Sequence, residues 1–115
     1  MIGLEALYTV EFGDVAGFGC RNGGVVVLET GRIYGGDSGY YYLGTFQVRE
    51  SRIEANVKVV KYNPDWGNVF GDSSCSFGIV LCGIIANNTI DGFMERIDKH
   101  GIRLPVRLIR KEVLP

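Results

Sequence analysis

Residues 52–62, RIEANVKVVKY, decide the fold class of this chain. Apolar residues occupy the odd positions from 53 to 59, and polar or charged residues occupy the even positions from 52 to 58. Because successive side chains of a β-strand point to opposite faces, this alternation predicts a strand with one dry and one wet face. Such strands are typical of antiparallel sheets, which bury one face and expose the other.

Further strands are predicted on both sides of this one. Residues 24–30 are rich in β-branched side chains and end at the turn pair Gly31-Arg32. Glycine accounts for 17 of the 115 residues without a collagen-like period, so many tight turns are expected. The alternation of apolar and polar residues recurs in three other stretches, 8–12, 40–48 and 103–113.

These strands follow one another with short connections, which favours a meander. About eight strands are expected, the number at which a barrel interior is filled by side chains or holds one small ligand. Closing the sheet would also remove its exposed edges. We therefore predict an all-β fold: a single domain over residues 1–115, built as an antiparallel, up-and-down, lipocalin-like barrel.

Residues 89–97 fit two structures. Gly92 would cost a helix about 1 kcal/mol, and a helix here would also remove one hairpin from the meander. We therefore predict a strand over 89–97 and a turn over 98–101. The helical alternative remains open because four apolar residues have the spacing of one helix face: Ile90, Phe93, Met94 and Ile97.

Short motifs in the sequence do not combine into an active site. Residues 36–39, GDSG, match the string around the nucleophile of trypsin-like proteases, but the only histidine, His100, follows the serine instead of preceding it. We interpret GDSG as a turn in which Asp37 accepts hydrogen bonds from nearby backbone N–H groups. The three cysteines form no CxxC pair, so no zinc site is indicated. We expect neither enzymatic activity nor a metal or other cofactor.

The charge and the apolar runs bear on location and partners. A formal net charge of −1 gives no strong field that would attract nucleic acid or anionic lipid. The first residues, MIGLEALYTVEF, lack the basic start of a signal peptide and contain two glutamates. The longest apolar run, residues 77–86, is too short for a helix that crosses a membrane. We expect a cytoplasmic protein that binds neither nucleic acid nor membrane directly.

Two sets of side chains are candidates for binding. One would line a ligand cavity inside the barrel: Tyr8, Tyr40, Tyr42, Phe46 and Val57. The other would contact a protein partner or a second copy of the chain, because residues 75–86 are apolar on both faces and one face should be exposed. Its members are Tyr41, Trp66, Val80, Cys82 and Ile84. For the aromatic residues the alternative is a structural role in the core, with hydroxyls at the barrel mouth.

Up to residue 63, the chain resembles the GrlR-like family, which comprises negative regulators of type III secretion gene expression and uncharacterised bacterial relatives. The resemblance rests on LYTVEF at 7–12, GGVVVLETGRIYGGDSGYYYLG at 23–44 and KYN at 61–63. It implies a lipocalin-like barrel without enzymatic activity, often dimeric, that binds a transcriptional activator and holds it off DNA. In the founding members an acidic turn makes that contact, whereas the matching turn here, residues 47–52, has one acid and two bases.

The expectations for function are therefore two. The resemblance implies a regulatory interaction module with a protein partner such as a transcriptional regulator, acting as a homodimer. The alternative is a barrel that binds a small hydrophobic ligand in its interior.

Overall fold

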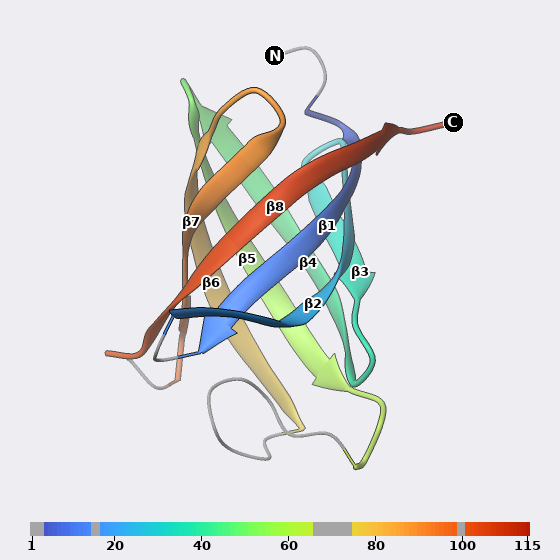
Figure 1. Cartoon of the computed structure of the whole chain (residues 1–115), viewed down its shortest axis with the longest axis vertical. Helices are drawn as coiled ribbons and strands as arrows, with labels where there is room; N and C mark the ends of the chain where they lie inside the picture. Colours follow the sequence, from blue (N-terminus) through green and yellow to red (C-terminus); the bar gives the residue numbers. More distant parts are fainter. Residues whose placement is uncertain (1–3, 15–16, 66–74, 99–100) are drawn as a thin grey trace.

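The structure is a computed structural model and describes residues 4–14, 17–65, 75–98 and 101–115. Within these ranges eight β-strands form one closed barrel, in which each strand pairs antiparallel with the next (Figure 1). The predicted all-β up-and-down barrel is therefore confirmed. In chain order the strands are β1 (Ala6–Asp14), β2 (Gly17–Glu29), β3 (Arg32–Gly36), β4 (Tyr40–Arg49), β5 (Arg52–Lys61), β6 (Ser76–Ile85), β7 (Thr89–Arg96) and β8 (Arg103–Val113).

The core lies inside the barrel, on the inner faces of the strands. On β5 the apolar residues at odd positions 53–59 are buried and the polar residues between them are exposed, as the alternation predicts. On β8 the inward residues Leu104, Val106 and Leu108 are at most 2% exposed. The period-2 pattern of the sequence is thus the pattern of inside and outside in the barrel.

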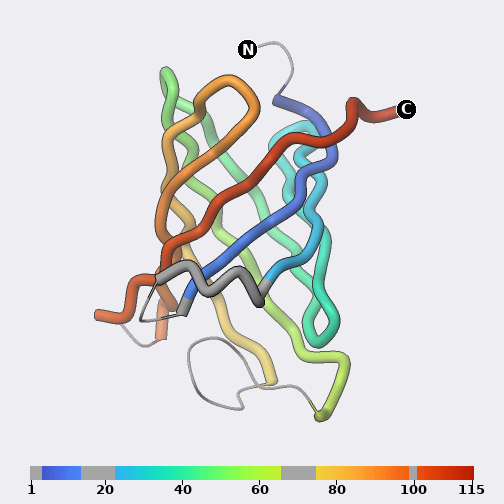
Figure 2. Tube along the Cα trace, viewed as in Figure 1, coloured from blue at the N-terminus to red at the C-terminus, as the bar shows by residue number. Residues whose placement is uncertain are grey.

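The last strand closes the barrel on the first. Ala6 at the start of β1 pairs with Val113 at the end of β8, so these two segments lie side by side (Figure 2). The register between the two strands shifts once, between Leu7 and Tyr8, which marks a β-bulge. Closure leaves the barrel wall continuous from β8 to β1.

Two-residue turns connect the strands at two hairpins. Thr30 and Gly31 form the β2–β3 turn with φ angles of 51° and 74°, one residue earlier than the predicted pair Gly31-Arg32. Positive φ at both central residues is the geometry that matches the twist of the flanking strands, and glycine adopts it without strain. Arg32 instead begins β3, paired with Glu29.

The segment over 89–97 is a strand, as predicted, because both of its edges pair: β7 lies between β6 and β8. Gly92 faces Gly83 directly across the β6–β7 pair. A Cβ atom at Gly92 would lie 1.9 Å from the carbonyl oxygen of Cys82, so only glycine fits at this close approach of the two backbones. Gly92, which disfavours a helix over 89–97, is therefore also the residue that the sheet requires at this position.

Candidate functional site

The five residues predicted to line a cavity all lie on inner faces, on β1, β4 and β5. Tyr8, Tyr40 and Val57 are 3%, 4% and 6% exposed, whereas Tyr42 and Phe46 are half-buried and pack against the core. The Tyr8 hydroxyl donates a hydrogen bond to the carbonyl oxygen of Leu4 at 2.7 Å. The small accessible surface of three of the five side chains favours a filled interior, and the ligand cavity stays a prediction.

Asp37 organises the β3–β4 turn. One carboxylate oxygen accepts hydrogen bonds from the backbone N–H groups of Gly39 and Tyr40, at 2.8 and 2.9 Å. The other oxygen accepts the hydroxyl of Tyr42, and the Tyr62 hydroxyl donates to the Asp37 carbonyl oxygen. Burial, and then the hydrogen bond to this carboxylate, raise the pKa of Tyr42. The prediction that GDSG is a turn held by Asp37 is confirmed. Both oxygens of the Asp37 carboxylate accept hydrogen bonds within or next to this turn.

Two aromatic rings flanked by two cationic groups form a row over the neighbouring strands β4 to β7, at the end of the barrel next to this turn. The ring of Tyr40 meets that of Phe77 edge-on at 6.1 Å, and the Lys61 ammonium lies 5.9 Å from the Tyr40 ring centre. The Arg96 guanidinium lies 4.2 Å from the Phe77 ring centre and donates two hydrogen bonds to Asp98, at 2.9 and 2.8 Å. The Phe77 ring and the Asp98 carboxylate thereby stabilise a cation that is 1% exposed.

Sequence reasoning missed the buried Arg96, although a signal was present. Arg96 has the same parity as Ile90 and Met94, so a strand over these residues must place it on the inner face. An inward arginine requires a carboxylate or a ring nearby, and Asp98 follows two positions later.

One buried polar atom has no hydrogen-bond partner. Among side chains that the structure describes, the Tyr40 hydroxyl is the single buried nitrogen or oxygen atom in this condition. An unsatisfied buried hydroxyl costs about 1–3 kcal/mol.

The predicted partner surface is brought together only in part. Cys82 and Ile84 are exposed on the outer face of β6, with Val80 half-buried on the same face, as expected. Tyr41 is also on the outside, but on β4, and the polar outer face of β5 separates it from β6. Trp66 lies outside the described residues.

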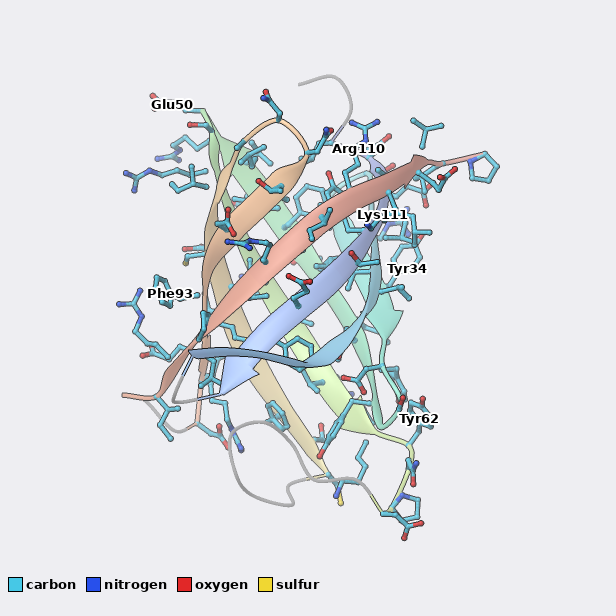
Figure 3. The ribbon with its side chains drawn as sticks, viewed as in Figure 1. Tyr34, Glu50, Tyr62, Phe93, Arg110 and Lys111 are labelled. Atoms are coloured by element: carbon cyan, nitrogen blue, oxygen red, sulfur yellow. The ribbon has the colours of Figure 1, made fainter. Side chains whose placement is uncertain are left out.

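A second apolar surface on the outside of the barrel, with three exposed and three half-buried members, was not predicted as a unit. It extends over neighbouring strands β2 to β5 and is here called the outer apolar face; its members are Val25, Val27, Tyr34, Tyr41, Leu43 and Val60. The strand register joins them into two rows, one running from Val27 through Tyr34 to Leu43. Figure 3 shows Tyr34 on one side of the barrel and Phe93 of β7 on the opposite side. The signal in the sequence was the uninterrupted apolar run at 25–27, which places side chains on both faces of β2.

Other site classes find no support in the described ranges. No group of three or more metal-ligating side chains comes together there. No helix in the same residues has the length and apolar character of a transmembrane span. No family model matches the chain, and no curated protein matches it.

Proposed function

We propose that this chain is a non-enzymatic regulatory module that binds a protein partner through the outer apolar face. The observation that carries the proposal is the exposure of this surface: Leu43 is 52%, Val25 46% and Tyr41 41% exposed. Single exposed apolar residues are ordinary, whereas a contiguous group on adjacent strands is typical of interaction sites. Tyrosine is also among the residues enriched in the energetic centre of interfaces.

The resemblance to GrlR-like regulators supports the same proposal from the sequence. Its longest matching stretch, residues 23–44, supplies five of the six members of the outer apolar face. In that family the partner is a transcriptional activator, so a transcriptional regulator is the partner class that we propose here. The expected homodimer would form through the other exposed apolar surface, around Ile84 on β6.

A matched pair of variants tests the proposal. Tagged wild-type chain, Leu43→Gln and Ile84→Gln serve as baits in a lysate of the native cell, and captured proteins are quantified by mass spectrometry. The two residues have nearly equal exposure, 52% and 50%, so both substitutions remove similar apolar surface. We expect Leu43→Gln to lose a protein that wild type and Ile84→Gln retain. Equal capture by all three baits would contradict the proposal.

The dimer is tested separately by size-exclusion chromatography at micromolar concentration. We expect wild type and Leu43→Gln to elute as dimers and Ile84→Gln to shift toward the monomer. A strictly monomeric wild type would remove the homodimer from the proposal and leave the partner site untouched.

One observation favours the alternative of a small hydrophobic ligand. The unpaired Tyr40 hydroxyl would donate to an acceptor on a ligand held among the core side chains. Native mass spectrometry of gently purified chain should then show a retained mass that Tyr40→Phe loses. A single mass equal to the polypeptide, in both proteins, would exclude this alternative.

A further inference from the structure

Basic side chains border the outer apolar face. Lys58 on β5 stands directly opposite Leu43, and Arg32 on β3 stands opposite Thr45, the next outward residue of β4. Both bases are exposed. Residues directly opposite across an antiparallel pair lie within about 5.5 Å at Cβ, so the Lys58 side chain is in reach of whatever covers Leu43.

Two more arginines lie on the same outer surface at the hairpin between β4 and β5, beyond Asn56 and Glu54. Arg49 and Arg52 form the last pair before the turn, which Glu50 begins with φ 58° (Figure 3, Glu50). Both arginines are exposed. Like charges directly opposite each other on one face of a sheet repel, so this pairing is unfavourable in the isolated chain.

Glu29 and Glu54 stand near these bases but make no ion pair with them. In the part of the chain that the structure describes, no carboxylate lies within ion-pair distance of Arg32, Lys58 or the two hairpin arginines. Glu29, opposite Arg32, instead accepts the Tyr34 hydroxyl at 2.7 Å. Glu54 lies opposite Gln47 on one side and beside Cys82 on the other.

We propose that the partner surface that covers Leu43 is acidic, with carboxylates placed to meet Lys58, Arg32, Arg49 and Arg52. This inference rests on the proposed function and assigns the partner's chemistry. A protein is favoured over nucleic acid because Leu43 and Tyr41 present apolar surface among the bases, and because the chain as a whole has a net charge of −1. Complementary charge of this kind accelerates encounter and selects the partner.

Defined probes test the acidic chemistry without the natural partner. The ¹⁵N-labelled full chain is titrated with a short peptide of alternating leucine and glutamate, with the same peptide carrying lysine for glutamate, and with a thymidine oligonucleotide. We expect the glutamate peptide alone to shift the amide signals of β4 and β5 around Leu43 and Lys58. Its affinity should fall at least fivefold in Lys58→Glu and also fall as salt is raised.

The matched control is Lys111→Glu, a charge reversal at an exposed position of β8, where affinity for the glutamate peptide should equal that of wild type. Absence of binding by the glutamate peptide, or equal binding by the lysine peptide, overturns the inference. Stronger binding by the oligonucleotide at the same residues also overturns it, in favour of nucleic acid. If lysate capture still depends on Leu43 in that case, the proposed function stands and only the acidic chemistry is refuted.

Discussion

Replacing Gly92 with alanine adds only one methyl group, yet it should destabilise the barrel strongly. The new Cβ atom would lie 1.9 Å from the Cys82 carbonyl oxygen and 2.6 Å from the Cα atom of Gly83, both of them backbone atoms. Restoring a separation of 3.0 Å from that oxygen requires β6 and β7 to move apart by about 1.1 Å. Neither strand has a free side toward which it can move, because β5 and β8 pair with their outer edges.

The expected loss in the free energy of unfolding is about 1–3 kcal/mol, the usual range for overpacking. For a domain of this size, that loss lowers Tm by about 4–12 °C. Urea unfolding followed by circular dichroism, with a thermal scan beside it, measures both quantities. The slope of the urea transition should stay unchanged, since the surface exposed on unfolding is nearly the same.

Gly78→Ala is the matched control on the neighbouring strand. The atom nearest to its Cβ would be Cδ1 of Ile97, at 3.0 Å, which is the end of a flexible side chain, and the nearest backbone atom, the Val57 carbonyl oxygen, would lie at 3.9 Å, an ordinary contact distance. Alanine also restricts the unfolded chain, so we expect stability within about 0.5 kcal/mol of wild type. A Gly92→Ala variant as stable as wild type, or an equal loss in both variants, would refute the account of the close backbone approach.

Four other substitutions test the core, the buried cation and the Asp37 turn. Leu104→Ala, at a residue with no exposed surface, should lower the free energy of unfolding by about 2–5 kcal/mol in urea melts, and a loss below 1 kcal/mol would contradict its central place in the core. Asp98→Ala should lower the free energy of unfolding by about 1–3 kcal/mol, because it removes a carboxylate from the buried Arg96 guanidinium. Arg96→Met should lower it less, because the Asp98 carboxylate that remains is half-exposed. The reverse order in thermal melts would argue against the pairing. The raised pKa of Tyr42 means that the folded chain keeps a proton which the unfolded chain loses above about pH 10. The stabilisation from this retained proton is complete below that pH and falls above it by about 1.4 kcal/mol per pH unit. In urea melts between pH 9 and pH 11, the free energy of unfolding of Tyr42→Phe should therefore decline less steeply than that of wild type. Parallel declines in the two proteins would exclude this cause.

The strands of the barrel could be predicted from the sequence because the alternation of apolar and polar residues is a local property of each strand. Alternation within 52–62 requires only that neighbours along one strand point to opposite sides, and the structure keeps that pattern from Arg52 to Val59. The same local rule left 89–97 ambiguous, since helix and strand periods both fit; pairing on both edges, which is not local, decides for the strand. The Asp37 turn was also predictable, because an aspartate before glycine bonds the backbone within three residues.

The outer apolar face could not be predicted in the same way. Val27 on β2 and Leu43 on β4 join one row only through Tyr34 of β3, and that requires the register of two strand pairs. Register depends on turn positions, and the β2–β3 turn lies one residue earlier than the glycine suggested. Tyr41 and Ile84 both lie on the outside of the barrel, but β5 stands between their strands.

The pairing of β1 with β8 has a consequence for how the chain is made. These strands are the first and the last in the barrel, so their contacts form only after all the intervening residues have been synthesised. Until β8 emerges from the ribosome, β1 and β7 each carry an open backbone edge beside apolar side chains. Contacts between such distant residues also form slowly, which lengthens this exposed period. Biosynthesis of this barrel is therefore the stage at which a chaperone, or an early-binding partner, would protect it from aggregation.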